Sequence, residues 1–236
     1  MSENHNKSGN LSSSGSGLLY PFIIVLKSWY FYIGLISLIA GMELNFISQT
    51  YLYNYVNDGG TLPMLNDLIL DKLPFYNVTL IYDIFSIIAV IIVIIYVVHK
   101  KDYNRIPFLL MMSGIIEIVR AIFVVLTPLG NPPMFPGSDG LFNGFSKYEL
   151  GVYPSGHVGS VFLLLLMVKS RLYKWLIFVC LIAVIISLFI AHAHYSIDIL
   201  SGFFFAYAIN YFGNKHFKMF ELDNKITTTG NDKIPV

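Results

Sequence analysis

Six stretches of the chain are almost entirely apolar, and polar stretches separate them. A helix needs roughly 17 to 25 apolar residues to cross the hydrocarbon core of a bilayer, which is about 30 Å thick. The segments that meet or approach this length are 24–47, 78–98, 106–126, 154–169, 172–192 and 194–213. The pattern predicts an all-α fold, a bundle of six transmembrane helices. The fourth segment is short, which indicates a start inside a pocket, where protein or water can cover non-helical backbone.

The two ends of the chain are polar. Residues 1–17 are rich in Ser, Asn and Gly, which predicts a disordered tail. The apolar run that begins near Leu18 is too long for a signal peptide and lacks a small-residue cleavage site, so it is expected to stay as an anchor. The predicted organisation is therefore a tail over 1–17, one membrane domain over 18–213 and a polar tail over 214–236.

Composition agrees with a polytopic membrane protein, because 56% of the residues are hydrophobic and 12% are charged. The formal net charge is +1 and no basic cluster is interleaved with aromatics, which excludes nucleic acid as the expected partner. The single cysteine, Cys180, has no second cysteine with which to form a disulfide.

Basic residues lie unevenly on the two sides of the predicted bundle. Lysines and arginines near the cytoplasmic ends of spans set membrane orientation. On one side lie Lys7, Lys27, Lys100, Lys101, Arg105, Lys169, Arg171, Lys174, Lys215, Lys218, Lys225 and Lys233; on the other lie Lys72 and Lys147. The pattern predicts that both termini are cytoplasmic. The remaining basic residue, Arg120, falls within the third segment.

Two histidines mark the starts of predicted helices on the opposite, extracytoplasmic or luminal side. His157 begins the fourth segment and His194 begins the sixth, and both of these helices run inward. Arg120 lies in the outer half of the third helix, which runs outward. Three groups that can handle phosphate are therefore expected at one depth, although they are remote in sequence.

The residue types fit phosphoryl transfer. Asp198 follows His194 by four residues, so on a helix its carboxylate can bind one imidazole nitrogen and leave the other nucleophilic. We expect His194 to attack phosphorus and His157 to protonate the leaving alkoxide. Arg120 and the backbone at Ser155 and Gly156, at a helix amino terminus, are expected to bind the phosphate.

At these residues the chain resembles the type 2 phosphatidic acid phosphatase superfamily, through "PSGH" at 154–157 and the His-x3-Asp of His194 and Asp198. It is most similar to the sphingomyelin synthase-like branch, through "HAHYSID" at 192–198, "RAIFVVLTPLGNPP" from Arg120 and "GGTLPMLNDLIL" at 59–70. The similarity spans roughly 60–210. It implies six helices and metal-free transfer of a phosphorylated headgroup between lipids by the two histidines and the aspartate.

The chain also departs from these patterns. Ser187 and Leu188 stand where the phosphatase branch has Ser-Arg before its last histidine, and a Lys-x6-Arg-Pro motif is absent. Ala193 stands where animal sphingomyelin synthases carry an acidic residue, and Pro154 is phosphatase-like. These departures leave the headgroup and the acceptor open.

Several polar residues have two interpretations. Arg120 either binds phosphate or pairs structurally with Glu117, three residues earlier. His192 is expected to be a turn residue or to support the site, as are Glu117 and Tyr195, whereas Glu43 and Asp83 either bond between helices or line a pocket. Phe135, Leu141, Phe142 and Phe145, in the long loop after the third helix, form either a lip for lipid tails or ordinary loop packing.

The sequence therefore predicts a membrane enzyme that moves a phosphorylated headgroup from a phospholipid to a lipid hydroxyl, of the ceramide or diacylglycerol type, through a phosphohistidine. It is expected to use no metal or cofactor, and the sequence does not predict its oligomeric state. A phosphatase that uses water as acceptor is the alternative. A channel or transporter without catalysis is a further alternative, but it requires polar groups through the whole membrane depth, whereas here they gather at one face.

Overall fold

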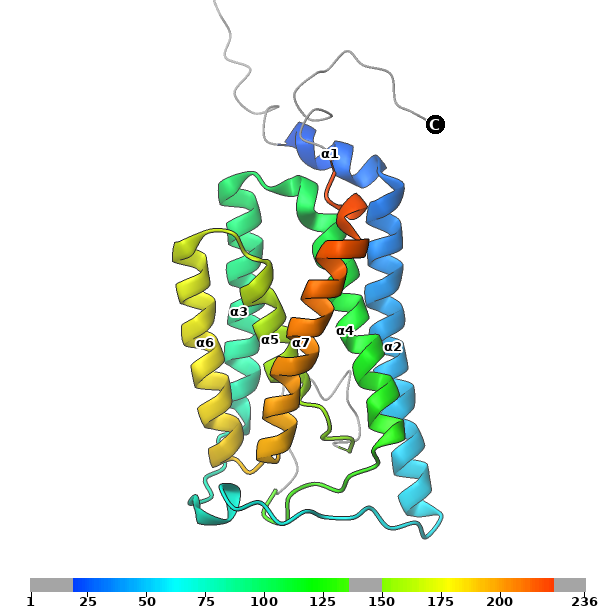
Figure 1. Ribbon diagram of the computed structural model, residues 1–236, viewed down its shortest axis with the longest axis vertical. Helices are drawn as coiled ribbons and strands as arrows, with labels where there is room; N and C mark the ends of the chain where they lie inside the picture. The colour runs from blue at the N-terminus through cyan, green and yellow to red at the C-terminus, as the bar shows by residue number, and fades with distance from the viewer. Residues whose placement is uncertain (1–18, 136–149, 223–236) are drawn as a thin grey trace, which may run out of the picture.

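The computed structural model describes residues 19–135 and 150–222, and the regular secondary structure of these residues is all helical (Figure 1). The α-helices are α1 (Leu19–Lys27), α2 (Trp29–Asn57), α3 (Thr79–Lys100), α4 (Ile106–Leu126), α5 (Gly156–Met167), α6 (Arg171–Ile190) and α7 (Ser196–His216). Short 3-10 turns lie at η1 (Leu70–Lys72), η2 (Tyr103–Arg105) and η3 (Lys218–Phe220). The predicted all-α class is confirmed for this part of the chain.

Four helical stretches are long and apolar enough to cross a membrane: Trp29–Asn57, Thr79–Lys100, Tyr103–Leu126 and Arg171–Ile190. The protein is therefore an integral membrane protein. Two of the six predicted spans, which correspond to α5 and α7, are not among these four. Helix α5 has 12 residues, or about 18 Å of rise, less than the hydrocarbon core. Helix α7 has 21 residues, but Ser, Gly and Asn residues make it less apolar than the four.

The first predicted helix, 24–47, differs from what the structure shows. Ser28 has an extended backbone, with φ −77° and ψ 131°, and separates α1 from α2. Helix α2 then continues to Asn57, ten residues past the predicted end. The extension carries Ser48 and Gln49, which are polar yet buried. A prediction based on runs of apolar residues ends such a helix too early, because it assigns a polar residue that faces the protein interior to a loop.

Two helix pairs form the sides of the bundle: α2 packs along α4, and α3 packs along α6, with α5 and α7 between the pairs (Figure 1). Helices α2 and α4 approach closely where both have small residues. A Cβ added to Gly41 would lie 2.7 Å from the carbonyl oxygen of Gly114, and one added to Gly114 would overlap Ser37. Small residues allow this contact between membrane helices, where burial of apolar surface gives little driving force.

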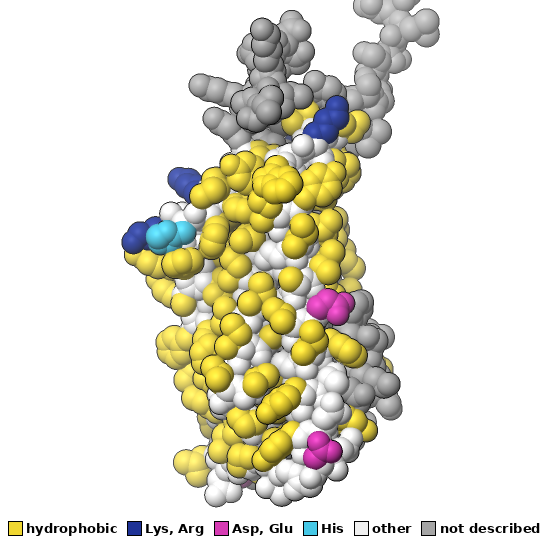
Figure 2. Space-filling model, turned by 90° about the vertical axis from the view of Figure 1, so that its right-hand side faces the viewer, with side chains coloured by type: hydrophobic (Ala, Val, Ile, Leu, Met, Phe, Trp, Pro, Cys, Tyr) yellow, Lys and Arg dark blue, Asp and Glu magenta, His cyan; other side chains and the backbone are white. Residues whose placement is uncertain are grey.

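Large apolar side chains point outward around the bundle. Trp29, Ile36, Ile94, Val179 and Phe204 are each more than half exposed. Figure 2 shows the face formed around α2, where apolar side chains cover most of the surface. Basic side chains on this face gather near the end that carries α1, and acidic ones lie farther down.

The predicted tails fall mostly outside the described residues. This is so for 1–17 and for 223–236 of the carboxyl-terminal tail. The part of that tail that is described is ordered, because α7 continues to His216 and η3 follows it. The predicted boundary at residue 213 is therefore too early.

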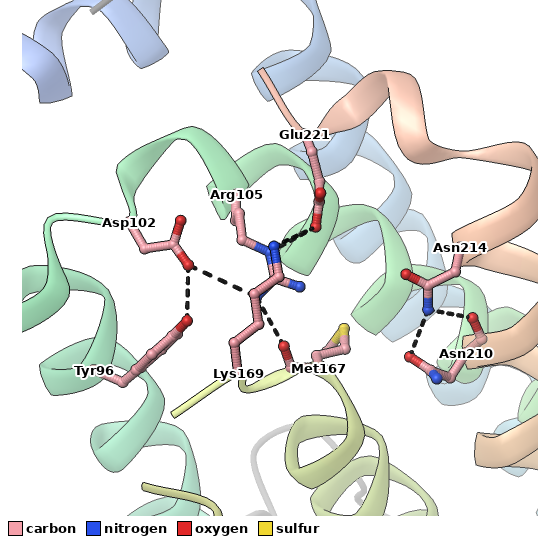
Figure 3. Close-up of polar contacts among 8 residues, drawn as sticks. All are labelled: Tyr96, Asp102, Arg105, Met167, Lys169, Asn210, Asn214 and Glu221. Atoms are coloured by element: carbon pink, nitrogen blue, oxygen red, sulfur yellow. Dashed lines mark hydrogen bonds and ion pairs between the residues drawn. The ribbon is translucent and has the colours of Figure 1, made fainter. Parts of the chain in front are cut away.

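A polar cluster closes the end of the bundle opposite the histidines (Figure 3). Arg105, counted above as a loop residue, is 5% exposed. Its Nε donates to Glu221 Oε1 at 2.7 Å and its Nη1 to the carbonyl oxygen of Met167 at 2.8 Å. Asp102 Oδ2 lies 3.7 Å from Nη1 and accepts a hydrogen bond from Tyr96. Arg105 thus joins the start of α4, the end of α5 and the segment after α7.

We expect Arg105→Gln to destabilise the protein by about 2–4 kcal/mol, because loss of one partner leaves the buried acceptors of this cluster poorly satisfied. Thermal unfolding in detergent would measure it. Lys169→Gln is the matched control: Lys169 Nζ is 3.6 Å from the same carboxylate, but its side chain is 64% exposed. Its loss should cost less than about 1 kcal/mol. Equal effects of the two changes would contradict a structural role for Arg105.

Candidate active site

The connection between α2 and α3, residues 58–78, holds the turn between α6 and α7. Asp67 accepts hydrogen bonds from the backbone N–H and the hydroxyl of Ser196. The backbone N–H of Leu65 donates to the Tyr195 hydroxyl at 3.1 Å, and His192 Nε2 lies 3.2 Å from the carbonyl oxygen of Leu73. This connection therefore fixes the turn that carries His194.

The turn is sharp, and His192 lies at its bend with a φ of +50°. Its ring also stacks edge-on against Phe75, at 5.8 Å between ring centroids. Tyr195 caps α7 and is almost fully buried. These two residues support the position of His194 and lie outside the cavity described below.

His194 faces Asp198 from one turn before it. His194 Nδ1 lies 3.4 Å from Asp198 Oδ2, and both side chains are buried. The same oxygen accepts the backbone N–H of Tyr195 at 2.9 Å, as part of a capping box. Within the described residues, His194 Nδ1 and Asp198 Oδ1 have no hydrogen-bond partner.

Burial favours the neutral form of His194. Its pKa is lowered, first by loss of solvation, and the nearby Asp198 carboxylate opposes that shift only in part. A neutral imidazole is the nucleophilic form. The Asp198 carboxylate lies beside Nδ1, so Nε2 is the nitrogen left for attack.

His157 has a carboxylate partner that the sequence did not assign to it. His157 Nε2 lies 2.9 Å from Oδ1 of Asp83, on α3. Asp83 is 2% exposed, and the His157 side chain is 26% exposed. Tyr82 packs edge-on against the His157 ring, at 4.9 Å between centroids. The sequence signal for Asp83 was its place near the outer end of a predicted span, at the depth predicted for His157.

The two histidines face each other. Their ring centroids are 6.4 Å apart and the rings are close to perpendicular. They come from α5 and from the turn before α7, whose amino-terminal ends lie at the same end of the bundle (Figure 1). The predicted convergence of His157 and His194 is thus present in the structure, with a carboxylate beside each ring.

Arg120 lies next to the start of α5. Its Nη1 donates to Asn45 Oδ1 at 3.0 Å, and its Nε and Nη2 lie 3.4 Å from the carbonyl oxygens of Pro154 and Gly151. A Cβ on residue 156 would lie 2.8 Å from Arg120 Nε, so a larger residue there would displace the guanidinium. The guanidinium therefore lies over the "PSGH" turn.

The structural alternative for Arg120 is an ion pair with Glu117. In the structure, Asn45 lies between these two side chains. Glu117 accepts hydrogen bonds from the Asn45 amide, and from the Ser160 hydroxyl at 3.0 Å. Asn45 therefore joins Glu117 to Arg120, with its amide nitrogen toward the acid and its oxygen toward the guanidinium. Asn45 was missed, because an isolated Asn in an apolar helix does not indicate its partner.

The amino terminus of α5 lies beside the Arg120 guanidinium. Ser155 is the N-cap residue and its hydroxyl accepts from the Val158 N–H at 3.5 Å. The first N–H groups of a helix attract anions, because the helix itself leaves them unpaired. Ser155, Gly156 and Arg120 thus meet beside His157, as the sequence predicts.

A cavity of about 1020 Å³ connects these groups to the middle of the bundle. Asp83, Glu117, Arg120, His157 and His194 line it. Phe135 of the predicted lip also lines it, whereas Leu141, Phe142 and Phe145 lie outside the described residues. Glu43 is exposed on α2 and is not part of the lining, so the pocket interpretation is wrong for it.

Known metal sites need several convergent ligands. In the described part of the chain, His, Cys, Asp and Glu side chains form no group of three or more that could hold a metal ion. The ionisable side chains of the site include two His–carboxylate pairs and one arginine.

No family model matches the chain, and no curated protein is significantly similar to it.

Asp67→Asn should destabilise the protein by about 1–3 kcal/mol, because the amide accepts the Ser196, Ile69 and Leu70 hydrogen bonds less well than a carboxylate. Burial alone would raise the pKa of Asp67, but these hydrogen bonds outweigh it and lower the pKa. The stabilisation is therefore present above about pH 4 and is lost as pH falls through the lowered folded-state value.

Thermal unfolding at neutral pH and in acid would test this. The matched control is Asp71→Asn in the same connection, where the side chain is exposed. A wild-type melting temperature for Asp67→Asn at neutral pH would show that Asp67 does not hold the turn.

Proposed function

We propose that this protein is an integral-membrane phosphotransferase that moves a phosphorylated headgroup from a phospholipid to the hydroxyl of a second lipid, of the ceramide or diacylglycerol type. The observation that carries the proposal is the pair of facing histidines, 6.4 Å apart, each beside a carboxylate, at the polar end of a large cavity. A phosphorus atom between the rings would contact one histidine as nucleophile and bring its leaving oxygen to the other.

In the first step, His194 Nε2 attacks phosphorus, the N–P bond forms and the bond between phosphorus and the donor lipid oxygen breaks. His157 gives its proton to that oxygen, so a neutral lipid alcohol leaves. Asp198 stabilises the positive charge that develops on His194, as the acid of a catalytic triad does for its histidine. Asp83 holds His157 Nε2 at 2.9 Å, so Nδ1 is the nitrogen that transfers the proton.

In the second step, the acceptor hydroxyl gives its proton to His157 and attacks the phosphohistidine. A new O–P bond forms, the N–P bond breaks, and His194 returns to its neutral form. His157 thus acts first as acid and then as base. Atoms and protons balance over the two steps without a further reactant.

Fixed donors can stabilise the negative charge on the phosphoryl oxygens. Arg120 and the backbone N–H groups at the start of α5 are already oriented by Asn45, the "PSGH" turn and the helix itself. Preorganised donors of this kind often give the largest part of catalysis. The proposed mechanism uses no metal or other cofactor.

The resemblance to the sphingomyelin synthase-like branch supports the same reaction class, through "PSGH" and "HAHYSID". We extend it to the membrane arrangement: six spans, with α5 and α7 as the fourth and sixth, both termini cytoplasmic and the site on the extracytoplasmic or luminal face. Basic side chains near the α1 end support this orientation (Figure 2).

Hydrolysis is the second candidate function. The His157 side chain is 26% exposed, so water could reach the nitrogen that activates the acceptor. A channel has less support, because the charged groups of the cavity lie at one end and mostly apolar side chains line the rest.

His194→Ala should abolish turnover, and Asp198→Asn should lower kcat by about 10²–10⁴-fold, because it removes the charge that stabilises the imidazolium. The assay would supply fluorescent ceramide or diacylglycerol with a panel of phospholipid donors and identify the products by mass. The control is His99→Ala, since His99 is an exposed histidine that contacts Tyr173 at the other end of the bundle. Turnover by His194→Ala near the wild-type rate would refute the mechanism.

The acceptor can be identified by titration. If the cavity protects the phosphohistidine from water, little soluble phosphate or phospho-headgroup should appear without an acceptor. Addition of ceramide or diacylglycerol should then raise donor consumption and yield a new phospholipid. If soluble release dominates at every acceptor concentration, the protein is a phosphatase.

A further inference from the structure

The cavity extends far beyond the groups that the reaction needs. Along α3 its lining runs from Asp83 to Val98, and along α4 from Arg120 back to Ile106. From residue 83 to residue 98 a helix rises about 22 Å, whereas half of the hydrocarbon core is about 15 Å. The cavity therefore continues past the expected midplane of the bilayer.

Polarity falls along this length. On α3, the polar Asp83 and Ser86 are followed by only Ile and Val, and on α4 the lining beyond Ser113 is leucine and isoleucine. The far end is lined by Phe22 of α1 together with Val97, Tyr103 and Ile106. One end thus suits a phosphate and the remainder suits a hydrocarbon chain.

We infer that this cavity binds one acyl chain of the donor phospholipid at full extension, and that its far end, at Phe22, Val97, Tyr103 and Ile106, sets the longest chain accepted. The inference rests on the proposed function for the position of the phosphate, beside Arg120 and the two histidines. The chain then lies along α3 and crosses the midplane inside the protein. A chain too short to reach the far end leaves apolar surface unfilled, so long-chain donors bind better.

A donor in the surrounding bilayer can reach this cavity from the side. Ile91, Ile94 and Val98 line the cavity and are about half exposed, and the neighbouring α3 residues Val90 and Ile95 are exposed as well. The wall formed by α3 therefore borders both the cavity and the membrane. This matches a ligand that arrives from the bilayer with its headgroup at one end.

The test uses phosphatidic acid with a diazirine at the terminal carbon of one palmitoyl chain, incorporated with the protein in lipid nanodiscs. After illumination, labelled peptides are identified by mass. Label should concentrate on the far-end residues in the wild-type protein. Ile94→Trp should reduce it about tenfold, because the larger side chain narrows the cavity at mid-depth.

The matched control is Ile95→Trp. Ile95 is the next residue of α3, is 51% exposed against 57% for Ile94, and does not line the cavity. Far-end labelling should stay at the wild-type level in this variant. Val93→Phe, at the same depth but buried, is a second way to obstruct the cavity and should act as Ile94→Trp does.

Three results would overturn the inference. In the first, outward residues such as Val179 are labelled as strongly as the far end. In the second, labelling of the far end is unchanged in both Ile94→Trp and Val93→Phe. In the third, a diazirine diacylglycerol labels the far end and the phosphatidic acid does not. The first indicates bulk lipid contact and the third an acceptor site. Labelling requires no turnover, so a protein that labels as expected but fails the transfer assay contradicts the proposed function alone.

Discussion

Ionisable side chains inside an apolar bundle must find partners, and this constraint organises the structure. The carboxylates Asp83 and Asp198 are both almost fully buried, and each lies beside a histidine. Glu117 and Arg120 both bind Asn45. Because a charge without a partner is costly in such a setting, these groups gather where they can satisfy one another. The same gathering gives the site two His–carboxylate pairs and an arginine within reach of one phosphate.

The bundle positions these pairs through contacts at both ends. At the histidine end, the connection between α2 and α3 binds the turn before α7 through Asp67, Leu65 and Leu73. At the other end, Arg105 joins α4, α5 and the segment after α7. Between them α5 is short, so its amino terminus lies inside the protein beside Arg120. A full-length span would have carried this terminus, and the first N–H groups that attract phosphate, away from the histidines.

The sequence could predict whatever follows from the length of apolar runs and the direction of each helix. Those two features place His157, His194 and Arg120 at one depth. They do not give the rotation of a helix about its axis, which decides that Asp83 faces His157 while Glu43 faces outward. Nor do they reveal the break at Ser28, which comes from one extended residue. The role of Asn45 depends on two neighbours more than 70 positions away, which hydropathy along the chain does not record.

The two histidines differ in environment in a way that suits two roles. His194 is 6% exposed and its pKa is lowered by burial, which favours the neutral form that the proposed attack needs. His157 is more exposed, and its carboxylate partner comes from another helix, so the proton transfers proposed for this ring do not involve the cap of α7. Asp198, in contrast, caps α7 and faces His194 with the same oxygen. In the proposed transfer, the charge that forms on His194 would therefore be met by a group already fixed in place, which would lower the reorganisation that the step requires.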